Sequence, residues 1–181
     1  ATPSKSENLR EARRAVRRGD HIQAGRFYEA AADWGAAAEA YERGRAFAEA
    51  AALWERSNQP AKAARLYEQA GESTKAAELY ARLGNYARAA GLFQKGRQDI
   101  KAAEAYQRAG DPEQAAELYA RHEVFDRAGD LLSGLGQPER AAELFERALR
   151  RLVLRRGGEP SPEGERERQA LARRAGGLYV Q

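Results

Sequence analysis

Few side chains in this sequence belong to the types that carry out covalent or metal chemistry. The 181 residues contain no cysteine and only two histidines, His21 and His122. The chain therefore has no thiolate nucleophile and no disulfide, and two isolated histidines do not match the spacing of a metal motif. The sequence also contains no phosphate-binding loop, nucleotide fingerprint or serine nucleophile elbow. These absences predict that the protein is not an enzyme and has no cofactor or metal.

Basic side chains could still bind a partner, because they recur at intervals of thirteen residues or multiples of it. This basic column consists of Arg17, Arg43, Arg56, Arg82, Lys95, Arg108, Arg121 and Arg147. A glutamate stands four residues earlier in five cases, as in Glu39/Arg43 and Glu78/Arg82, so intrahelical ion pairs are the favoured interpretation. Arg56 follows Ala52 instead and is the best-placed unpaired candidate.

A second candidate surface lies near the C-terminus. Arg147, Arg150, Arg151, Arg155 and Arg156 alternate with apolar residues before Gly157. This segment could bind an acidic protein, nucleic acid or an anionic membrane. The favoured alternative is a longer last repeat helix, covered by a capping helix predicted from Ser161 to Ala175, because the ends of a solenoid need polar caps.

The elements that position these residues follow from an internal repeat. One large residue, here called the anchor, recurs every thirteen residues without an insertion. The anchors are Tyr28, Tyr41, Trp54, Tyr67, Tyr80, Phe93, Tyr106, Tyr119, Leu132 and Phe145, and Ala15 continues the register toward the N-terminus. Such self-similarity predicts a repeat architecture of about eleven units.

Each unit has the pattern of a short amphipathic helix. Small residues stand three and four positions before the anchor, and leucine often stands one before it, as in Ala63, Ala64 and Leu66 before Tyr67. These positions share one stripe of an α-helix. Glycine four residues after the anchor, as at Gly71 and Gly84, predicts the turn that ends the helix. We expect the aromatic anchors to form the core between layers.

Other positions in the turns are less uniform. Pro60, Pro112 and Pro138 predict helix starts, and Ser73 and Thr74 are candidate caps of the following helix. His122 and Glu123 replace the expected glycine turn, and Gly129 and Gly134 then fall inside a helix, so we interpret this stretch as a tolerated local defect rather than a hinge. Trp34, Phe47, Tyr86 and Phe125 follow the anchors by six residues and either staple helix entries or anchor a partner.

Helices of about ten residues joined by short turns must pack against one another. The sequence therefore predicts an all-α solenoid, a right-handed superhelix of antiparallel short helices with 13-residue units and 26-residue helical hairpins. We expect a flexible segment at residues 1–7, the solenoid at 8–156, a linker at 157–162, and a capping helix and tail at 163–181.

The stretch from Lys75 to Phe93, with its Leu83-Gly84-Asn85-Tyr86 turn, resembles a tetratricopeptide repeat and, more closely, the short-helix repeats of soluble attachment proteins. The resemblance covers about residues 8–149. It implies that helices anchored at Tyr28, Trp54, Tyr80, Tyr106 and Leu132 are A-type and line a concave face, and that the others are B-type. A hairpin here spans 26 residues rather than 34, so the peptide-clamp residues of the longer family do not transfer.

The resemblance implies a scaffold or adaptor that binds a protein or peptide partner, with candidate binding residues Arg56, Arg82, Arg108, Phe125, Arg150 and Arg151. The first alternative is nucleic-acid or anionic-surface binding through the arginine-rich ends; the second is a self-assembling spacer. The regional net charges of +3, −3 and +4 for residues 1–20, 21–145 and 146–181 give no dedicated nucleic-acid groove. We expect no transmembrane segment and a cytoplasmic location.

Overall fold

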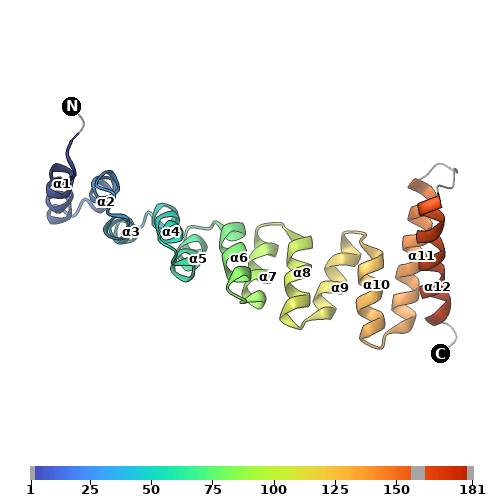
Figure 1. Ribbon diagram of the computed structural model, residues 1–181. Coiled ribbons are helices and arrows are strands. Elements are labelled where there is room, and N and C mark those ends of the chain that lie inside the picture. Colours follow the sequence, from blue (N-terminus) through green and yellow to red (C-terminus); the bar gives the residue numbers. More distant parts are fainter. Residues whose placement is uncertain (1–2, 156–161, 179–181) are drawn as a thin grey trace. The chain divides into compact units, whose positions relative to one another are not determined.

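The computed structural model describes residues 3–155 and 162–178, and every regular element in these ranges is an α-helix. The chain forms two compact units, Ala1–Gly96 and Arg97–Gln181. The helices of the first unit are α1 (Lys5–Arg17), α2 (His21–Ala30), α3 (Trp34–Arg43), α4 (Phe47–Arg56), α5 (Pro60–Gln69), α6 (Ser73–Arg82) and α7 (Tyr86–Lys95). Those of the second are α8 (Asp99–Ala109), α9 (Pro112–Arg121), α10 (Phe125–Gly134), α11 (Pro138–Arg155) and α12 (Pro162–Leu178) (Figure 1).

Within each unit, each helix packs against the next helix along the chain (Figure 1). This order confirms the expected all-α, solenoid-like arrangement of short helices. The boundary between the units falls at Gly96 and Arg97, inside the range 8–156 that the sequence pattern assigns to one array.

The small residues before each anchor allow neighbouring helices to approach closely. Alanines at these positions are completely buried, as at Ala37 and Ala38 of α3. Where the residue three before the anchor is glycine, the contact can be located. A Cβ atom added at Gly25 would lie 2.8 Å from the Tyr41 ring, and one added at Gly129 would lie 2.7 Å from the Phe145 ring. The anchor of one helix therefore packs on the small residue of the helix before it.

Most anchors form the core, as the repeat predicts. The buried anchors are Tyr41, Trp54, Tyr67, Tyr80, Phe93, Tyr119, Leu132 and Phe145. Tyr28 and Tyr106 are half-buried. Gly129 is therefore a packing residue rather than the tolerated defect expected from the sequence, because the Phe145 ring occupies the space that a larger residue would need.

The turns within each unit use one geometry. The residue four after the anchor has a positive φ, and the next residue donates its N–H to the anchor carbonyl, as in Glu72 to Tyr67 at 2.9 Å. This is the hydrogen bond of a Schellman motif. Glycine occupies the positive-φ position at Gly19, Gly71, Gly84, Gly110 and Gly136. Larger residues occupy it at Ala32, Arg45, Asn58, Arg97 and Glu123, where the conformation is strained.

The residue that closes one turn is also the N-cap of the next helix. Asp111 does both: its N–H donates to the Tyr106 carbonyl at 2.9 Å, and its carboxylate accepts from the Gln114 N–H at 3.2 Å. The expected caps Ser73 and Thr74 are wrong, since the N-cap of α6 is Glu72, without a side-chain bond, and Ser73 is already helical. No residue lies between the hydrogen bond that ends one helix and the N-cap of the next helix. The position of each anchor therefore fixes the position of the following N-cap.

The two ends of the chain differ from the boundaries expected at residues 8 and 156. Helix α1 begins at Lys5, because Ser4 accepts from the Glu7 N–H and Glu7 accepts from the Ser4 N–H. Helix α11 ends at Arg155, and α12 packs against it with Leu171 and Ala175 buried. Helix α12 continues past the expected end at Ala175, to Leu178. The expected linker at 157–162 falls outside the described residues except for Pro162.

We predict that Gly25→Ala destabilises the protein by about 1–2 kcal/mol, since overpacking against the Tyr41 ring outweighs the gain in helix propensity. Gly91→Ala is the matched control, because a Cβ there meets no atom within 4 Å. It should stabilise α7 by at most about 1 kcal/mol. Urea denaturation of both variants measures the two changes, and equal effects would contradict the packing contact.

A reciprocal pair of turn variants tests the strained conformation. Ala32 has φ 57° and Gly71 has φ 79° at equivalent positions. Replacing Ala32 with glycine should raise the free energy of unfolding by about 0.5–1 kcal/mol, and Gly71→Ala should lower it by about 1 kcal/mol. Thermal and urea unfolding of the two variants report these differences. Changes of the same sign would refute a shared turn geometry.

Candidate functional site

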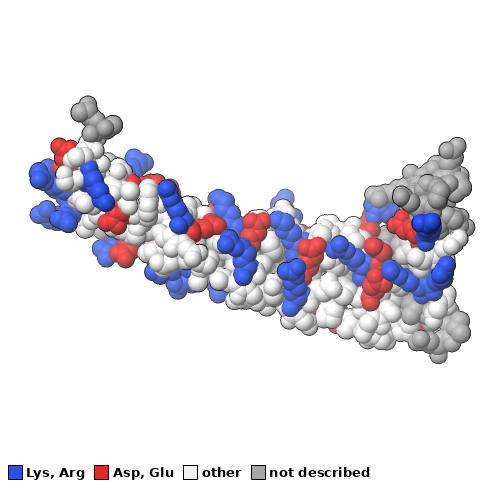
Figure 2. All heavy atoms as spheres, viewed as in Figure 1, with Lys and Arg blue, Asp and Glu red and all other residues white. Residues whose placement is uncertain are grey.

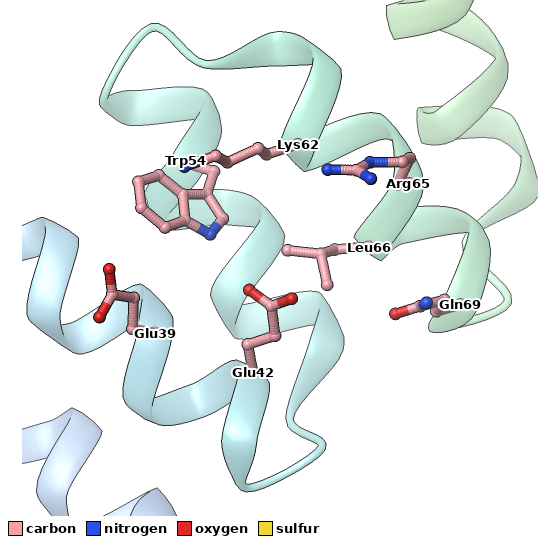
Figure 3. Close-up of a pocket in the computed structure, with 7 residues that line it drawn as sticks. All are labelled: Glu39, Glu42, Trp54, Lys62, Arg65, Leu66 and Gln69. Carbon is pink, nitrogen blue, oxygen red and sulfur yellow. The ribbon is translucent and has the colours of Figure 1, made fainter.

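The first unit contains a groove between α3 and α5, with the anchor of α4 as its floor. It has a volume of about 240 Å³ and is lined by Glu39, Glu42, Trp54, Lys62, Arg65, Leu66 and Gln69. Figure 3 shows the two glutamates coming from α3 and the basic residues coming from α5, on either side of Trp54. We call this the Trp54 groove.

The second unit contains a groove of the same construction between α9 and α11. Its volume is about 310 Å³, and it is lined by Ala116, Glu117, Ala120, Arg121, Leu132, Arg140, Glu143, Leu144 and Arg147. We call it the Leu132 groove, after the anchor of α10 that forms its floor.

The two grooves occupy equivalent positions of the repeat. Glu39 and Glu117 both stand two residues before their anchors, and Leu66 and Leu144 both stand one before. Lys62 and Arg140 both stand eight residues after the anchor that forms the floor. The grooves differ at four of these positions: the floor residue, and Glu42, Arg65 and Gln69, which are replaced by Ala120, Glu143 and Arg147. Both lie between helices that the sequence pattern labels B-type, over an A-type anchor.

Tyrosine anchors elsewhere in the repeat form hydrogen bonds to the preceding helix. The Tyr41, Tyr67 and Tyr80 hydroxyls each donate to a carboxylate twelve residues earlier: Glu29 at 3.0 Å, Glu55 at 3.4 Å and Glu68 at 3.3 Å. Burial is the main cause that raises the pKa of each of these phenols, and for Tyr41, where the pKa reaches about 12, the Glu29 hydrogen bond is the second.

A cation often lies over the anchor ring at these places. Arg88 lies 4.8 Å from the Tyr80 ring centroid and pairs with Glu68 at 2.8 Å. The guanidinium, the phenol and the carboxylate therefore all interact with one another. Lys75 lies 5.3 Å from the Tyr67 centroid, and Lys62 lies 4.0 Å from the Trp54 centroid. Stacking of this kind contributes about 0.5–1 kcal/mol at exposed sites.

Charged residues also link alternate helices. Arg82 of α6 pairs with Glu55 of α4 at 3.7 Å, and Arg127 of α10 pairs with Glu104 of α8 at 3.2 Å. The sequence pattern placed Arg82 and Glu104 in intrahelical pairs and gave no indication of these longer links. Figure 2 shows the resulting mixture of basic and acidic side chains on the visible face of each unit.

In the first unit, the two predicted binding residues are both exposed, and each interacts with another side chain of the protein. Arg56 ends α4, and its guanidinium lies 4.0 Å from the Trp34 ring centroid. Arg82 ends α6 and bridges to Glu55. Neither lines the Trp54 groove.

In the second unit, two of the four predicted residues meet. Phe125 and Arg151 line a small cavity of about 150 Å³ together with Leu152 and Leu171. The Arg151 guanidinium donates to the Glu123 carbonyl at 2.7 Å and pairs with its carboxylate at 2.9 Å, which ties α11 to the strained turn. Arg150 is exposed and pairs with Glu146 at 3.5 Å, and Arg108 is exposed on α8.

None of the six predicted binding residues lines either groove, although Arg121 and Arg147 of the Leu132 groove belong to the basic column. The basic groove residues Lys62 and Arg140 stand six residues after the column that includes Arg56, at the start of the following helix. The sequence signal that could have identified them is a basic residue eight positions after the anchor. It recurs at Lys75, Arg88, Lys101 and Arg127.

Within residues 3–155 and 162–178, no cluster of three or more histidine or carboxylate side chains could hold a metal ion. No helix in the same ranges combines the length and apolar character that crossing a bilayer requires. Comparison of the sequence with protein-family models and with curated proteins finds no match.

The raised pKa of Tyr41 gives a pH prediction. An unfolded tyrosine loses its proton near pH 10, and folded Tyr41 loses it only near pH 12. Its contribution to stability is complete below pH 10 and is lost as the pH rises toward 12, because the unfolded state then binds fewer protons. The free energy of unfolding should fall over this interval. Tyr41→Phe should make the fall shallower in urea titrations; an unchanged slope would contradict the assignment.

Proposed function

We propose that the protein is an interaction scaffold that binds an extended segment of a partner protein in the grooves between alternate helices. The observation that supports this is that one groove is built twice, at equivalent repeat positions, in the two units. A repeated groove follows from the thirteen-residue register, so side chains of a partner segment would meet grooves at equivalent repeat positions, each with its own lining.

The size and lining of the grooves favour side chains of a partner over a small molecule. Pockets for drug-sized ligands have volumes of about 300–1,000 Å³ and mostly apolar walls. The Trp54 groove, at about 240 Å³, is smaller, and the Leu132 groove, at about 310 Å³, lies at the lower limit. Exposed charged residues line both grooves.

We further propose that each pair of helices is a tetratricopeptide-like hairpin. Support comes from the short antiparallel helices, the three-residue turns and the small residues facing the neighbouring anchor. The grooves lie between B-type helices, whereas the resemblance directs attention to the A-type set. A cytoplasmic location and self-association both remain predictions.

Ion pairs near the ends of the chain weigh against binding to nucleic acid or an anionic surface. Arg14 pairs with Glu11 at 2.6 Å, Arg150 with Glu146 at 3.5 Å, and Arg174 with Asp130 at 3.2 Å. Each carboxylate offsets the field that its arginine would present to phosphate.

Capture from cell extract on the immobilised chain tests the function. We predict that Arg65→Glu and Arg147→Glu, one in each groove, weaken capture of a specific protein roughly tenfold, corresponding to about 1.4 kcal/mol each. Arg56→Glu and Arg82→Glu are matched charge reversals outside the grooves and should leave capture unchanged. Circular dichroism checks that all four variants fold.

Two outcomes would overturn the proposal. Loss of capture only with Arg56→Glu and Arg82→Glu would place binding on the other set of helices. Retention on heparin that falls steeply with salt, together with capture of nucleic acid rather than protein, would favour the arginine-rich ends.

A further inference from the structure

Trp54 is the one tryptophan among the anchors, and it leaves a hydrogen-bond donor without a partner. Its side chain is 5% exposed, and its Nε1 atom is buried with no acceptor. Figure 3 shows the indole nitrogen on the side of the groove that holds Glu42 and Leu66. Buried donors are nearly always paired in native structures, so an orphaned one calls for an explanation.

The neighbouring repeats show which hydrogen bond is missing at Trp54. Where the anchor is Tyr41, Tyr67 or Tyr80, its hydroxyl donates to the carboxylate twelve residues earlier. Glu42 stands twelve residues before Trp54, but its carboxylate forms no hydrogen bond or ion pair with any part of the described chain. At Trp54 the indole N–H therefore lacks an acceptor, and the Glu42 carboxylate lacks the donor that a tyrosine anchor supplies in the neighbouring repeats.

The charges of the groove limit which ligand group could supply both an acceptor for Trp54 Nε1 and a donor for Glu42. Glu39 and Glu42 lie on α3, whereas Lys62 and Arg65 lie on α5, so the lining residues have no net charge. A carboxylate would face the two glutamates, and an ammonium or guanidinium would leave Nε1 unpaired, since neither group accepts a hydrogen bond. A neutral group that both accepts and donates avoids both conflicts.

We propose that the Trp54 groove binds the carboxamide side chain of an asparagine or glutamine in the partner segment. The amide oxygen accepts from Trp54 Nε1 and from Lys62, and the two N–H bonds of the amide donate to Glu39 and Glu42. A main-chain amide has only one N–H and serves one of these carboxylates. This inference rests on the proposed function, because it names the group that the partner places in one of the grooves.

The second unit provides an internal comparison. In the Leu132 groove the floor is an anchor with no donor, and Ala120 replaces the glutamate that corresponds to Glu42. The groove retains Arg121, Arg140 and Arg147 among its lining residues. Carboxamide recognition is thus expected at the Trp54 groove and not at its counterpart.

The indole N–H resonances in ¹H–¹⁵N spectra of the full chain offer a direct test. The protein has two tryptophans, and Trp34→Phe assigns the resonance of Trp54. We expect propanamide to shift the Trp54 resonance in a saturable way and to leave that of Trp34 unchanged. N-methylacetamide, a mimic of the main chain, should bind more weakly. Propanoate and propylammonium, of similar size and single charge, should cause no saturable shift.

Two variants control the measurement. Glu42→Gln keeps the reporter and should weaken propanamide binding roughly tenfold, because it removes a charged acceptor. Trp54→Tyr should abolish the propanamide-induced shifts of backbone resonances in α3 and α5, since the new phenol can donate to Glu42 as its neighbours do to Glu29 and Glu68. This substitution matches the other repeats, and circular dichroism confirms that the variant folds.

Each remaining outcome decides against the inference. An absent shift, or a shift of equal size with propanoate or propylammonium, would overturn it. Equal binding of N-methylacetamide would assign the groove to the main chain instead. If Glu42→Gln moves the free Trp54 resonance and propanamide does not, Glu42 itself is the acceptor. If propanamide does not shift the Trp54 resonance but Arg65→Glu still loses capture of the partner, only this inference is refuted. If every groove variant retains capture, the proposed function is refuted.

Discussion

The contact between an anchor ring and the small residue of the preceding helix sets the rest of the structure. Gly25 and Gly129 show how close it is, since a Cβ atom at either place would come within 2.8 Å of the Tyr41 or Phe145 ring. Helices of about ten residues are marginal alone, so each depends on this packing. The alanines that occupy the same position elsewhere are buried.

The repeats differ in the side chain at the anchor rather than in added elements. A tyrosine anchor links two helices, as Tyr80 does through Glu68, with Arg88 stacked on its ring. Tryptophan or leucine at the same place keeps the core filled but removes the hydroxyl. The grooves over Trp54 and Leu132 coincide with those two replacements. In the repeat of Tyr80 the hydrogen bond joins the consecutive helices α5 and α6, and the Arg88–Glu68 ion pair joins the alternate helices α5 and α7.

Periodicity along the chain predicts which residues of a helix are buried, and it did so for the alanine pairs and most anchors. It says less about contacts between helices that are not consecutive. Arg56 looked unpaired because Ala52 stands four residues before it, where other repeats have glutamate, but its neighbour is Trp34, twenty-two residues earlier. The pair Arg82–Glu55 was missed for the same reason. The boundary after Gly96 gave no signal, since the spacing from Phe93 to Tyr106 continues unchanged across it.

The last residue of a turn both ends one helix and caps the next, and this limits how such a chain can change its length. Because Asp111 and its counterparts both close one helix and begin the next, the connection has no slack. Inserting one residue into a helix would rotate the part of that helix beyond it by about 100° around the axis and carry its apolar stripe away from the neighbouring helix. Growth or shortening is therefore tolerated in whole thirteen-residue steps, and only pairs of steps preserve the alternation of helix direction.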